Sequence, residues 1–538
     1  MVYKNKKRNE INLGIFLQDN GKYDDAIKVY LAILKKDKKN YLARINLSLC
    51  YFNNNQFNEA ADVLHQLHVD YPEDFNALKF CGIAYSKMGN FALAIEFFKR
   101  AIARKSDDFE TWIEITKAAG ANQQDIDAIY YATQAISLDP TKPIAHNNLG
   151  AAFMTIGKLN EALYCFETTL QLDPHNLIAK SNCSVIYEKR GDMNKAIATL
   201  ENCLPLAEKG SIQEAEIKFK MSLPLLYLGN LKRGWEMYDE GFKPKNTRTR
   251  TPKRQFDVPQ WQGEPIEDKR LLVWGEQGLG DELMFFRTLP EVFTHCNQIT
   301  IECTQRLVSL FQRAFPNCHV RSHAFDGSYF LKPIYSDFDY HIPVGSLMRL
   351  FRNDIADFKN VPPYIKVDPL LNEKFKDRLS KFKPKKLVGI CWRSGKLAQD
   401  RNLNYAPLSA WESIFSIENI QFVNLQYGDC SHELKQVQDF FGVDVLNWCD
   451  VDLKDDQESL AAIINNLDCV ISAGTAVAQL TGAIGAPLKL FTPRSWTLLG
   501  ENEYPWASNV DLYICNVDEH VDRLFPEIAN SLRKLMEN

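Results

Sequence analysis

Residues 148–174 read NLGAAFMTIGKLNEALYCFETTLQLDP, and the spacing of the small residues in this stretch is the strongest signal in the sequence. Its landmarks recur every 34 residues, which is the length of one helix-turn-helix unit. The alanine ladder is Ala26, Ala60, Ala94, Ala128, Ala162 and Ala196. A second ladder of small residues is Gly14, Ser48, Gly82, Thr116, Gly150 and Ser184. Small side chains at fixed intervals let two helices pack closely, so we predict a repeated array of helix pairs.

Turn and stop residues follow the same period. Glycines at the expected inter-helix turns are Gly21, Gly89, Gly157 and Gly191, and prolines that end units are Pro72, Pro140 and Pro174. On these ladders the first 200 or so residues resemble the tetratricopeptide repeat family. A seventh, irregular unit is LYLGNLKRGWEMYDEGF, in which Gly234 takes the alanine position after four extra residues. Residues 1–240 are therefore predicted to form an α-solenoid.

A ladder of asparagines suggests what the array binds. Its members share one position on the first helix of their units: Asn12, Asn46, Asn148 and Asn182. An amide both donates and accepts hydrogen bonds, so a row of them can pair with the backbone of an extended peptide. The row is similar to the asparagine ladder of the O-GlcNAc transferase solenoid, although Phe80 and Glu114 interrupt it. We expect an acceptor protein in this groove; solvated polar residues without a ligand are the alternative.

Composition limits the choice of partners and compartment. A formal charge of -5, with 45% hydrophobic and 24% charged residues, is ordinary for a folded, soluble chain and gives no basic field for nucleic acid. The start of the chain lacks the apolar stretch of a signal peptide, and no later apolar run is long enough to span a bilayer. We expect a cytoplasmic protein that needs no metal or other cofactor.

A basic segment separates the array from the rest of the chain. Residues 241–267 carry six Lys or Arg between Lys243 and Arg254. Such a run is typical of a solvated connector, so a linker is predicted here. Attraction of an anionic donor or an acidic partner is the alternative.

From residue 268 the pattern changes to short apolar runs alternating with helical stretches, which indicates parallel strands with crossover helices. The clearest predicted strands are RLLVW, QITIEC, KLVGICW, FVNLQY, DCVISA and LKLFTP. The polar segment LNEKFKDRLSKFKPKK divides them into two groups. We therefore predict an α/β domain of two lobes, residues 268–380 and 381–538. In such sheets ligands bind beyond the carboxyl ends of the strands.

Candidate site residues follow these strands. After the first strand come Glu276, Gly278, Gly280 and Asp281; the second lobe contributes Arg393, Ser394, Lys396, Arg401, Gln426, Gly474, Thr475 and Ala476. Backbone N–H groups at the helix start after Thr475, together with nearby cations, favour a phosphate group without any metal. The second-lobe residues and the two glycines are predicted to bind a nucleotide-sugar donor. Glu276 and Asp281, held beside the glycine turn, are the catalytic candidates.

Residues 255–515 resemble the C-terminal domains of bacterial tetratricopeptide proteins related to heptosyltransferases and other GT-B glycosyltransferases. The matching stretches are LLVWGEQGLGD, RTLP from Arg287 to Pro290, and Pro505 with Trp506. The resemblance implies that Asp281 is the base and that Lys396 or Arg401 contacts the donor phosphate. The chain departs from the family at GTAVAQLTG, since relatives usually read DTAVAHLAG; Gly474 and Gln479 replace Asp and His. Helix capping is the alternative role of Asp281.

These features favour a metal-independent, inverting protein O-glycosyltransferase in which the array captures the acceptor and the lobes hold a nucleotide sugar. The arrangement resembles that of flagellin-modifying glycosyltransferases, which implies a flagellin acceptor and a CMP-linked nonulosonic acid such as pseudaminic acid. Two other hypotheses stay open. One is a non-enzymatic adaptor with degenerate transferase lobes, and the other is sugar transfer to lipopolysaccharide or another glycan.

Overall fold

The computed structural model describes residues 2–243, 250–251, 253–323, 330–331, 337–359, 361–394 and 405–537. The chain divides into two compact units, Met1–Cys183 and Ser184–Asn538. Helical repeats make up the first unit, and the second contains the parallel sheets. A helical solenoid followed by an α/β region is therefore confirmed. None of the helices in the described ranges has both the length and the apolar character needed to cross a bilayer.

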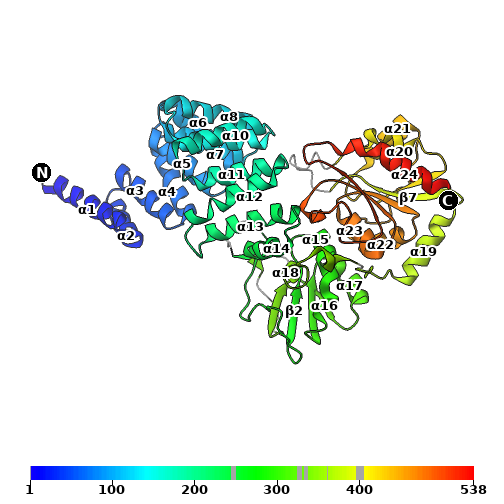
Figure 1. The fold of residues 1–538 in the computed structure, drawn as a ribbon. Helices are drawn as coiled ribbons and strands as arrows, with labels where there is room; N and C mark the ends of the chain where they lie inside the picture. Colours follow the sequence, from blue (N-terminus) through cyan, green and yellow to red (C-terminus); the bar gives the residue numbers. More distant parts are fainter. Residues whose placement is uncertain are drawn as a thin grey trace. The chain divides into compact units, whose positions relative to one another are not determined.

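The repeat helices follow one another in pairs (Figure 1). The first helices of successive units are α1 (Val2–Asp19), α3 (Tyr41–Asn53), α5 (Phe75–Lys87), α7 (Phe109–Ala121), α9 (Pro143–Thr155) and α11 (Leu177–Lys189). The second helices are α2 (Tyr23–Lys36), α4 (Phe57–Asp70), α6 (Phe91–Arg104), α8 (Asp125–Leu138), α10 (Leu159–Leu172) and α12 (Met193–Glu201). These bounds keep the 34-residue period of the sequence ladders.

The glycine ladder exists because an aromatic ring occupies the space that a side chain would need. A Cβ on Gly14 would lie 2.5 Å from the Tyr30 ring, and one on Gly82 would lie 2.5 Å from Phe98. A Cβ on Gly150 would lie 2.7 Å from Phe166. All three rings are fully buried. The predicted close approach of the two helices in a unit is confirmed, and each glycine pairs with one large ring.

Gly150→Val should therefore destabilise the array. The added methyl groups would overlap Phe166, and overpacking of this kind costs about 1–3 kcal/mol. Chemical denaturation followed by circular dichroism would measure the loss. Adding Phe166→Leu should restore part of it, because the smaller side chain makes room; a double variant no more stable than Gly150→Val would contradict this packing account.

The turns between paired helices need left-handed backbone. Gly21, Gly89 and Gly157 have φ of +70°, +79° and +78°. In the two units that lack glycine there, Asn55 and Gln123 adopt φ of +58° and +60°. Glycine takes this conformation without steric cost, whereas asparagine and glutamine do so less readily. The turn prediction is thus confirmed, and the conformation persists where the glycine is absent.

The last repeat helices belong to the second compact unit, because the division falls inside α11. The predicted seventh unit is a helix pair, α13 (Ile212–Tyr227) and α14 (Leu231–Asp239). Its turn residue Gly229 lies against Gly500, where an added Cβ would come within 3.0 Å of the Gly229 Cα. Gly191, in the preceding turn, lies against Val517. The end of the array is thereby packed on the loops that follow strands of the α/β region.

Glu188, near the end of α11, is expected to make stability depend on pH. Burial raises its pKa to about 7, against the opposing effect of Lys220 and Lys189. The folded state therefore holds a proton that the unfolded chain loses near pH 4.5, and stability declines as the pH rises through 7. Glu188→Gln should be about 1–3 kcal/mol more stable than the parent at pH 8 and equal to it below pH 4.5. Urea titrations at both pH values would check this, and equal stabilities at pH 8 would contradict it.

Two parallel sheets form the α/β region. The first has strand order β4-β3-β2-β6, with β2 (Arg270–Trp274), β3 (Gln298–Cys303), β4 (His319–Ser322) and β6 (Tyr340–Pro343). The second has order β11-β10-β9-β7-β8, with β7 (Lys386–Cys391), β8 (Ile420–Asn424), β9 (Cys469–Ala473), β10 (Leu488–Pro493) and β11 (Val510–Cys515). Five of the six predicted strand segments contain one of these strands, and the sixth, FVNLQY, overlaps β8 only at Phe422–Asn424. A short pair, β1 (Lys253–Arg254) with β5 (Phe330–Leu331), is separate from both sheets.

Helices lie beside both sheets (Figure 1). In the first lobe they are α15 (Leu279–Phe285), α16 (Leu289–Val292), α17 (Val308–Ala314) and α18 (Leu347–Phe351). In the second they are α20 (Glu412–Phe415), α21 (Ser431–Phe441), α22 (Gln457–Asn465), α23 (Ala476–Ile484) and α24 (Phe525–Glu537). The helix α19 (Pro369–Ser380), at the end of the predicted first lobe, packs against α22 of the second. Successive parallel strands joined through helices are the doubly wound arrangement that the sequence predicts.

The basic segment is more than a solvated connector. Arg250 is fully buried and pairs with Glu276, while the side chain of Arg254 is 3% exposed and pairs with Glu302. The expectation of an exposed linker is therefore wrong at these two positions. The physical reason is that carboxylates distant in the sequence neutralise both guanidinium groups, which makes their burial tolerable.

Candidate active site

The turn after β2 carries the candidate base. Gly275 N donates to Glu302 O at 2.6 Å, Gln277 adopts φ +66°, and α15 begins after Gly278. Asp281 lies half-buried in the first turn of this helix. Because Gly278 is the capping position, Asp281 occupies the third helical residue instead of the cap itself. Its carboxylate is thus held at the end of the first-lobe sheet by a short, constrained connection.

The second lobe supplies a helix start that meets this turn. Thr475 precedes α23, is buried, and makes no side-chain capping bond. A Cβ on Gly280 would lie 3.6 Å from the Ala476 Cα and 3.8 Å from its nitrogen. The structure therefore brings Gly280 and the neighbouring Asp281 together with the segment Gly474, Thr475 and Ala476. The turn after β2 and the turn after β9 belong to different lobes, and in the structure they lie against each other.

A chain of polar contacts crosses the ends of three second-lobe strands. Cys391 Sγ lies 3.6 Å from Thr475 Oγ1 and 3.6 Å from Gln426 Oε1. The same Gln426 oxygen accepts a 3.0 Å hydrogen bond from Arg393 N. Burial raises the pKa of Cys391 to about 11, so the thiol stays protonated at neutral pH. The predicted residues Gln426, Thr475 and Arg393 are thus connected at one edge of the sheet.

Of the three cations predicted for this edge, Arg393 is the one within the described residues. The Arg393 guanidinium makes a two-point pair with Glu433, with Nε to Oε1 at 2.8 Å and Nη2 to Oε2 at 2.5 Å. That carboxylate already balances its charge, so a phosphate would have to share or replace Glu433. Ser394 directly follows Arg393, and Lys396 and Arg401 lie outside the described residues.

Glu276, the second catalytic candidate, has strong partners. Arg250 Nε donates to its Oε2 at 2.7 Å, Arg250 Nη2 and Gly345 N donate to its Oε1, and the residue is 1% exposed. A carboxylate enclosed in this way is well placed to hold the turn and poorly placed to receive a proton from a substrate. The geometry therefore favours Asp281 over Glu276 as the base.

The two positions that depart from the family pattern have different environments. Gly474 is exposed, and the nearest atom to an added Cβ would be Thr492 Oγ1 at 3.7 Å, so the backbone has room for a side chain there. Gln479 Nε2 donates to Tyr504 OH at 2.7 Å. Burial raises the pKa of Tyr504 to about 12, and the carboxylate of Asp281 adds to this effect. Tyr504 and Gln479 therefore belong to the surroundings of Asp281.

The four asparagines of the ladder have different surroundings in the structure. Asn182 Nδ2 donates to Asn147 Oδ1 at 3.3 Å, and Asn148 Nδ2 is buried with no hydrogen-bond partner among the described residues. Asn12 on α1 is exposed and Asn46 on α3 is half-buried. Asn182 thus contacts the residue before Asn148 instead of Asn148 itself, and Asn12 and Asn46 lie beyond the interrupting Phe80 and Glu114.

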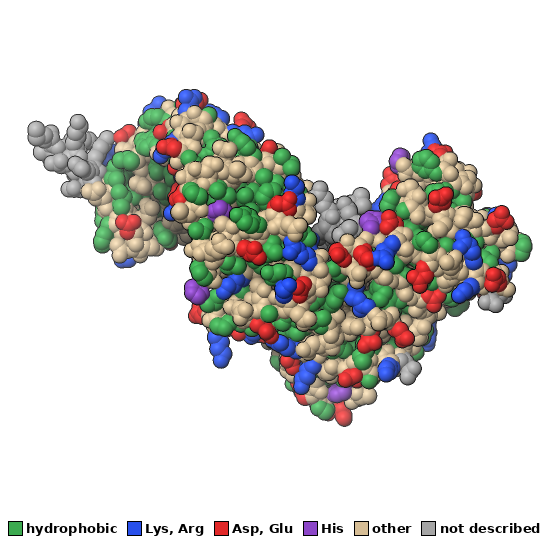
Figure 2. Space-filling view, turned by 45° about the horizontal axis from the view of Figure 1, so that its top comes forward, with side chains coloured by type: hydrophobic (Ala, Val, Ile, Leu, Met, Phe, Trp, Pro, Cys, Tyr) green, Lys and Arg blue, Asp and Glu red, His purple; other side chains and the backbone are tan. Residues whose placement is uncertain are grey.

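An exposed apolar ladder accompanies the amides and was not recognised in the sequence. Leu42, Ile144 and Ile178 are 54%, 42% and 63% exposed. Each lies four residues before Asn46, Asn148 or Asn182, so it shares a helix face with that asparagine. Figure 2 shows many hydrophobic side chains on the surface of the repeat region. The 34-residue register of these aliphatic residues could have revealed them.

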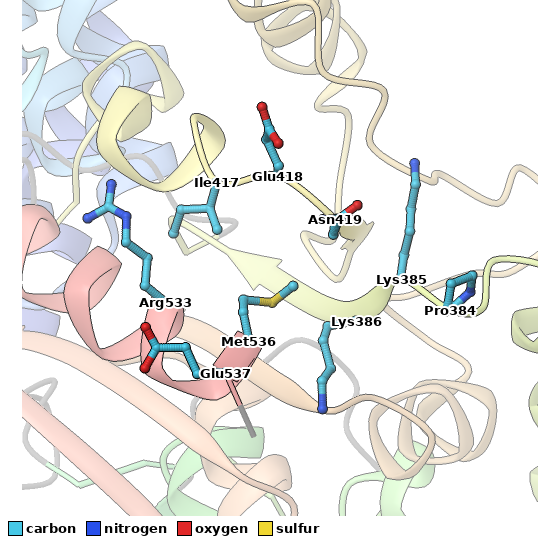
Figure 3. Close-up of a pocket in the computed structure, with 9 residues that line it drawn as sticks. All are labelled: Pro384, Lys385, Lys386, Ile417, Glu418, Asn419, Arg533, Met536 and Glu537. Carbon is cyan, nitrogen blue, oxygen red and sulfur yellow. The ribbon is translucent and has the colours of Figure 1, made fainter.

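A hollow of about 610 Å³ opens elsewhere on the second lobe (Figure 3). Lys386 begins β7 and Asn419 precedes β8, so the hollow lies at the amino ends of these strands. Ligands of parallel sheets bind at the opposite ends, which separates the hollow from the candidate site. Within the described ranges, no group of three or more His, Cys, Asp or Glu side chains is arranged to hold a metal ion.

Comparison with known proteins agrees with the repeat architecture. Models of the tetratricopeptide repeat match residues 17–80, 77–110 and 143–176. Protein FlbA of Caulobacter vibrioides is 30% identical over 535 residues, covering 96% of this chain and 88% of that protein. The chain belongs to the FlbA family.

Two plant proteins match shorter stretches of the chain. A barley (Hordeum vulgare) protein named probable UDP-N-acetylglucosamine–peptide N-acetylglucosaminyltransferase SPINDLY is 27% identical over 162 residues, 28% of this chain and 17% of that protein. Its namesake from Arabidopsis thaliana is 33% identical over 87 residues, 16% of this chain and 9% of that protein. Among solved structures, a tetratricopeptide repeat protein from Parabacteroides merdae aligns at 14% identity with a TM-score of 0.40, covering 45% of this chain and 94% of that one.

Proposed function

We propose that this protein is a glycosyltransferase that moves a sugar from a nucleotide-sugar donor to a polypeptide held by the repeat array. The observation that carries the proposal is the meeting of Gly280, beside Asp281, with Ala476 at the start of α23. This contact puts a carboxylate from one lobe next to a helix start that suits a phosphate on the other. The partial similarity to enzymes named as peptide glycosyltransferases supports the same function.

The chemistry is a direct displacement at the anomeric carbon in a GT-B arrangement. Asp281 takes the proton from an acceptor hydroxyl as that oxygen bonds to the anomeric carbon, and the bond from this carbon to the donor phosphate breaks. Backbone N–H groups at the start of α23 and the Thr475 hydroxyl stabilise the phosphate that leaves. The attack inverts the configuration at the sugar and uses no metal.

The first donor and acceptor to test come from the resemblance to flagellin-modifying enzymes. They are a CMP-linked nonulosonic acid and flagellin. A donor with one phosphate suits this site because Gly474 replaces the aspartate that relatives usually carry. The repeat groove, with its amides and exposed aliphatic side chains, is the surface for the acceptor.

A non-enzymatic adaptor is the second candidate, and Gly474 with Gln479 is the observation that favours it. Gln479 is engaged with the Tyr504 hydroxyl, and no side chain extends from position 474. Under this hypothesis the lobes keep their fold without binding a donor, and the repeat array carries the whole function.

Saturation-transfer NMR with CMP, UDP, GDP and ADP compounds separates these candidates. We expect saturation of CMP, reduced in the variant Gly474→Asp because the new carboxylate would repel the phosphate. Binding of another nucleotide in place of CMP would change the proposed donor class but would still support a glycosyltransferase. Saturation of none of the four would contradict the transferase and favour the adaptor.

A further inference from the structure

The turn that leads to Asp281 has an unfavourable backbone conformation. Gln277 has φ of +66°, in the left-handed region that side chains other than glycine rarely adopt. Such residues persist when surrounding contacts determine the conformation. Gln277 is followed by Gly278 and then by α15, so the direction of the Asp281 carboxylate depends on this turn.

Residues 250 and 251 hold the turn from outside. Gln277 N donates to Thr251 O at 2.5 Å. Arg250 donates hydrogen bonds to both carboxylate oxygens of Glu276, one from Nε to Oε2 at 2.7 Å and one from Nη2 to Oε1. Gly345 N completes the enclosure with a 2.9 Å bond to Glu276 Oε1. Two consecutive turn residues are therefore fixed by the segment that the sequence marks as a linker.

The same guanidinium reaches the last repeat helix. Arg250 Nη1 donates to Asp239 Oδ1 at 2.9 Å and to Ser346 Oγ at 3.2 Å. Its charged centre lies 4.3 Å from the ring centre of Tyr238 and 4.0 Å from that of Phe242. Tyr238 and Asp239 are the final residues of α14. Each of the three guanidinium nitrogens thus has a partner, and the partners come from the array, the glycine turn and the first lobe.

We propose that Arg250 is a positioning residue for Asp281, acting through Glu276, and that α14 is thereby part of the scaffold of the transferase site. The inference rests on the proposed function and deepens it. Glu276 then holds the turn and takes no proton from the acceptor. The end of the repeat array is needed to form the site as well as to deliver the acceptor.

Arg250→Lys tests the inference in the full chain, since lysine keeps the charge and loses the planar fork. We expect amide hydrogen exchange in a peptide covering residues 275–285 to rise at least about tenfold. The turnover number kcat should fall about 10- to 100-fold, because small misplacements of a catalytic group have effects of this size, with the donor KM within about twofold. Arg254→Lys is the matched control, because the Arg254 side chain is 3% exposed and pairs with Glu302 instead of Glu276; it should change neither quantity.

The isosteric variant Glu276→Gln gives a second test if Arg250→Lys does not fold. It should also raise exchange in the turn and lower kcat, and the acidic limb of its kcat–pH profile should remain because Asp281 sets it. Loss of that limb would make Glu276 the base and overturn the inference. Unchanged exchange at residues 275–285 in both variants would also overturn it. Hydrogen exchange can be measured without sugar transfer, so it tests the role of Arg250 even in an inactive protein. A wild-type protein without transferase activity would instead contradict the proposed function.

Discussion

Asp281→Asn should lower kcat by about 10²- to 10⁴-fold while leaving donor affinity within about twofold. A positioned carboxylate base contributes this much to a proton transfer, and asparagine keeps the shape but cannot accept the proton. Asp281 lies in the first turn of α15, next to the contact between Gly280 and Ala476, where the acceptor hydroxyl would meet the donor. Initial rates with saturating donor, together with calorimetric donor titration, would measure both effects.

The control for this variant addresses helix stabilisation as the alternative role. Asp368→Asn changes a true cap, since the Asp368 side chain accepts a 2.9 Å hydrogen bond from Leu371 N at the start of α19. Asparagine also caps helices well, so Asp368→Asn should keep nearly the wild-type melting temperature. Asp281 is the third helical residue, so Asp281→Asn should lose only the favourable interaction of a first-turn carboxylate with the helix dipole, about 0.3–1 kcal/mol. Full turnover by Asp281→Asn would remove Asp281 from the mechanism.

Replacing Asn46, Asn148 and Asn182 together by alanine should weaken acceptor binding about tenfold to a thousandfold. Each lost amide pair contributes on the order of 0.5 to 1.5 kcal/mol, and the expected range takes the three contributions as additive. The three asparagines lie in the first compact unit and the donor site in the second, so donor affinity should not change. Surface plasmon resonance with immobilised acceptor, a nucleotide titration and a thermal melt would test these statements.

The matched control lies on the second helices of the array. Tyr130 on α8 and Tyr164 on α10 are 55% and 72% exposed and occupy equivalent positions in successive units. Tyr130→Ser with Tyr164→Ser should leave acceptor binding intact if the asparagine face is the binding surface. The reverse outcome is normal acceptor binding by the asparagine variant and loss of binding by the tyrosine variant. It would show that the acceptor binds the surface formed by the second helices.

The repeats could be predicted in detail because several ladders report the same period. Ala162, Gly150 and Gly157 belong to three different ladders with the same 34-residue period. A different residue at one position of one ladder therefore does not hide the repeat. The six predicted strand segments were found for a related reason: their strands are runs of apolar residues long enough to recognise. The strands β4, β6 and β11 were missed because each is an edge strand that is only partly buried, whereas the edge strand β8 is buried along its whole length. An edge strand is less enclosed, so sequences such as HVRS and YHIP stay partly polar.

The candidate site divides in the same way. The positions of Asp281, Thr475 and Gln426 after the ends of β2, β9 and β8 could be predicted, because a run of apolar residues marks each strand. Their roles in catalysis and donor binding stay predictions. The role of Arg250 could not, because its partners Asp239, Glu276 and Ser346 are distant in the sequence and only the fold brings them together. A local run of positive charge normally indicates solvent exposure, and nothing within the run itself shows that two of its members are neutralised.

Intact-mass spectrometry of flagellin incubated with the purified protein and a CMP-linked nonulosonic acid would show whether the protein transfers a sugar to a polypeptide. We expect a mass increase of one or more sugar residues, absent when Asp281→Asn replaces the wild type. The contradicting result is a protein that binds both nucleotide and flagellin but leaves the flagellin mass unchanged with this donor and with UDP-, GDP- and ADP-sugars. That result would contradict the proposed glycosyltransferase function.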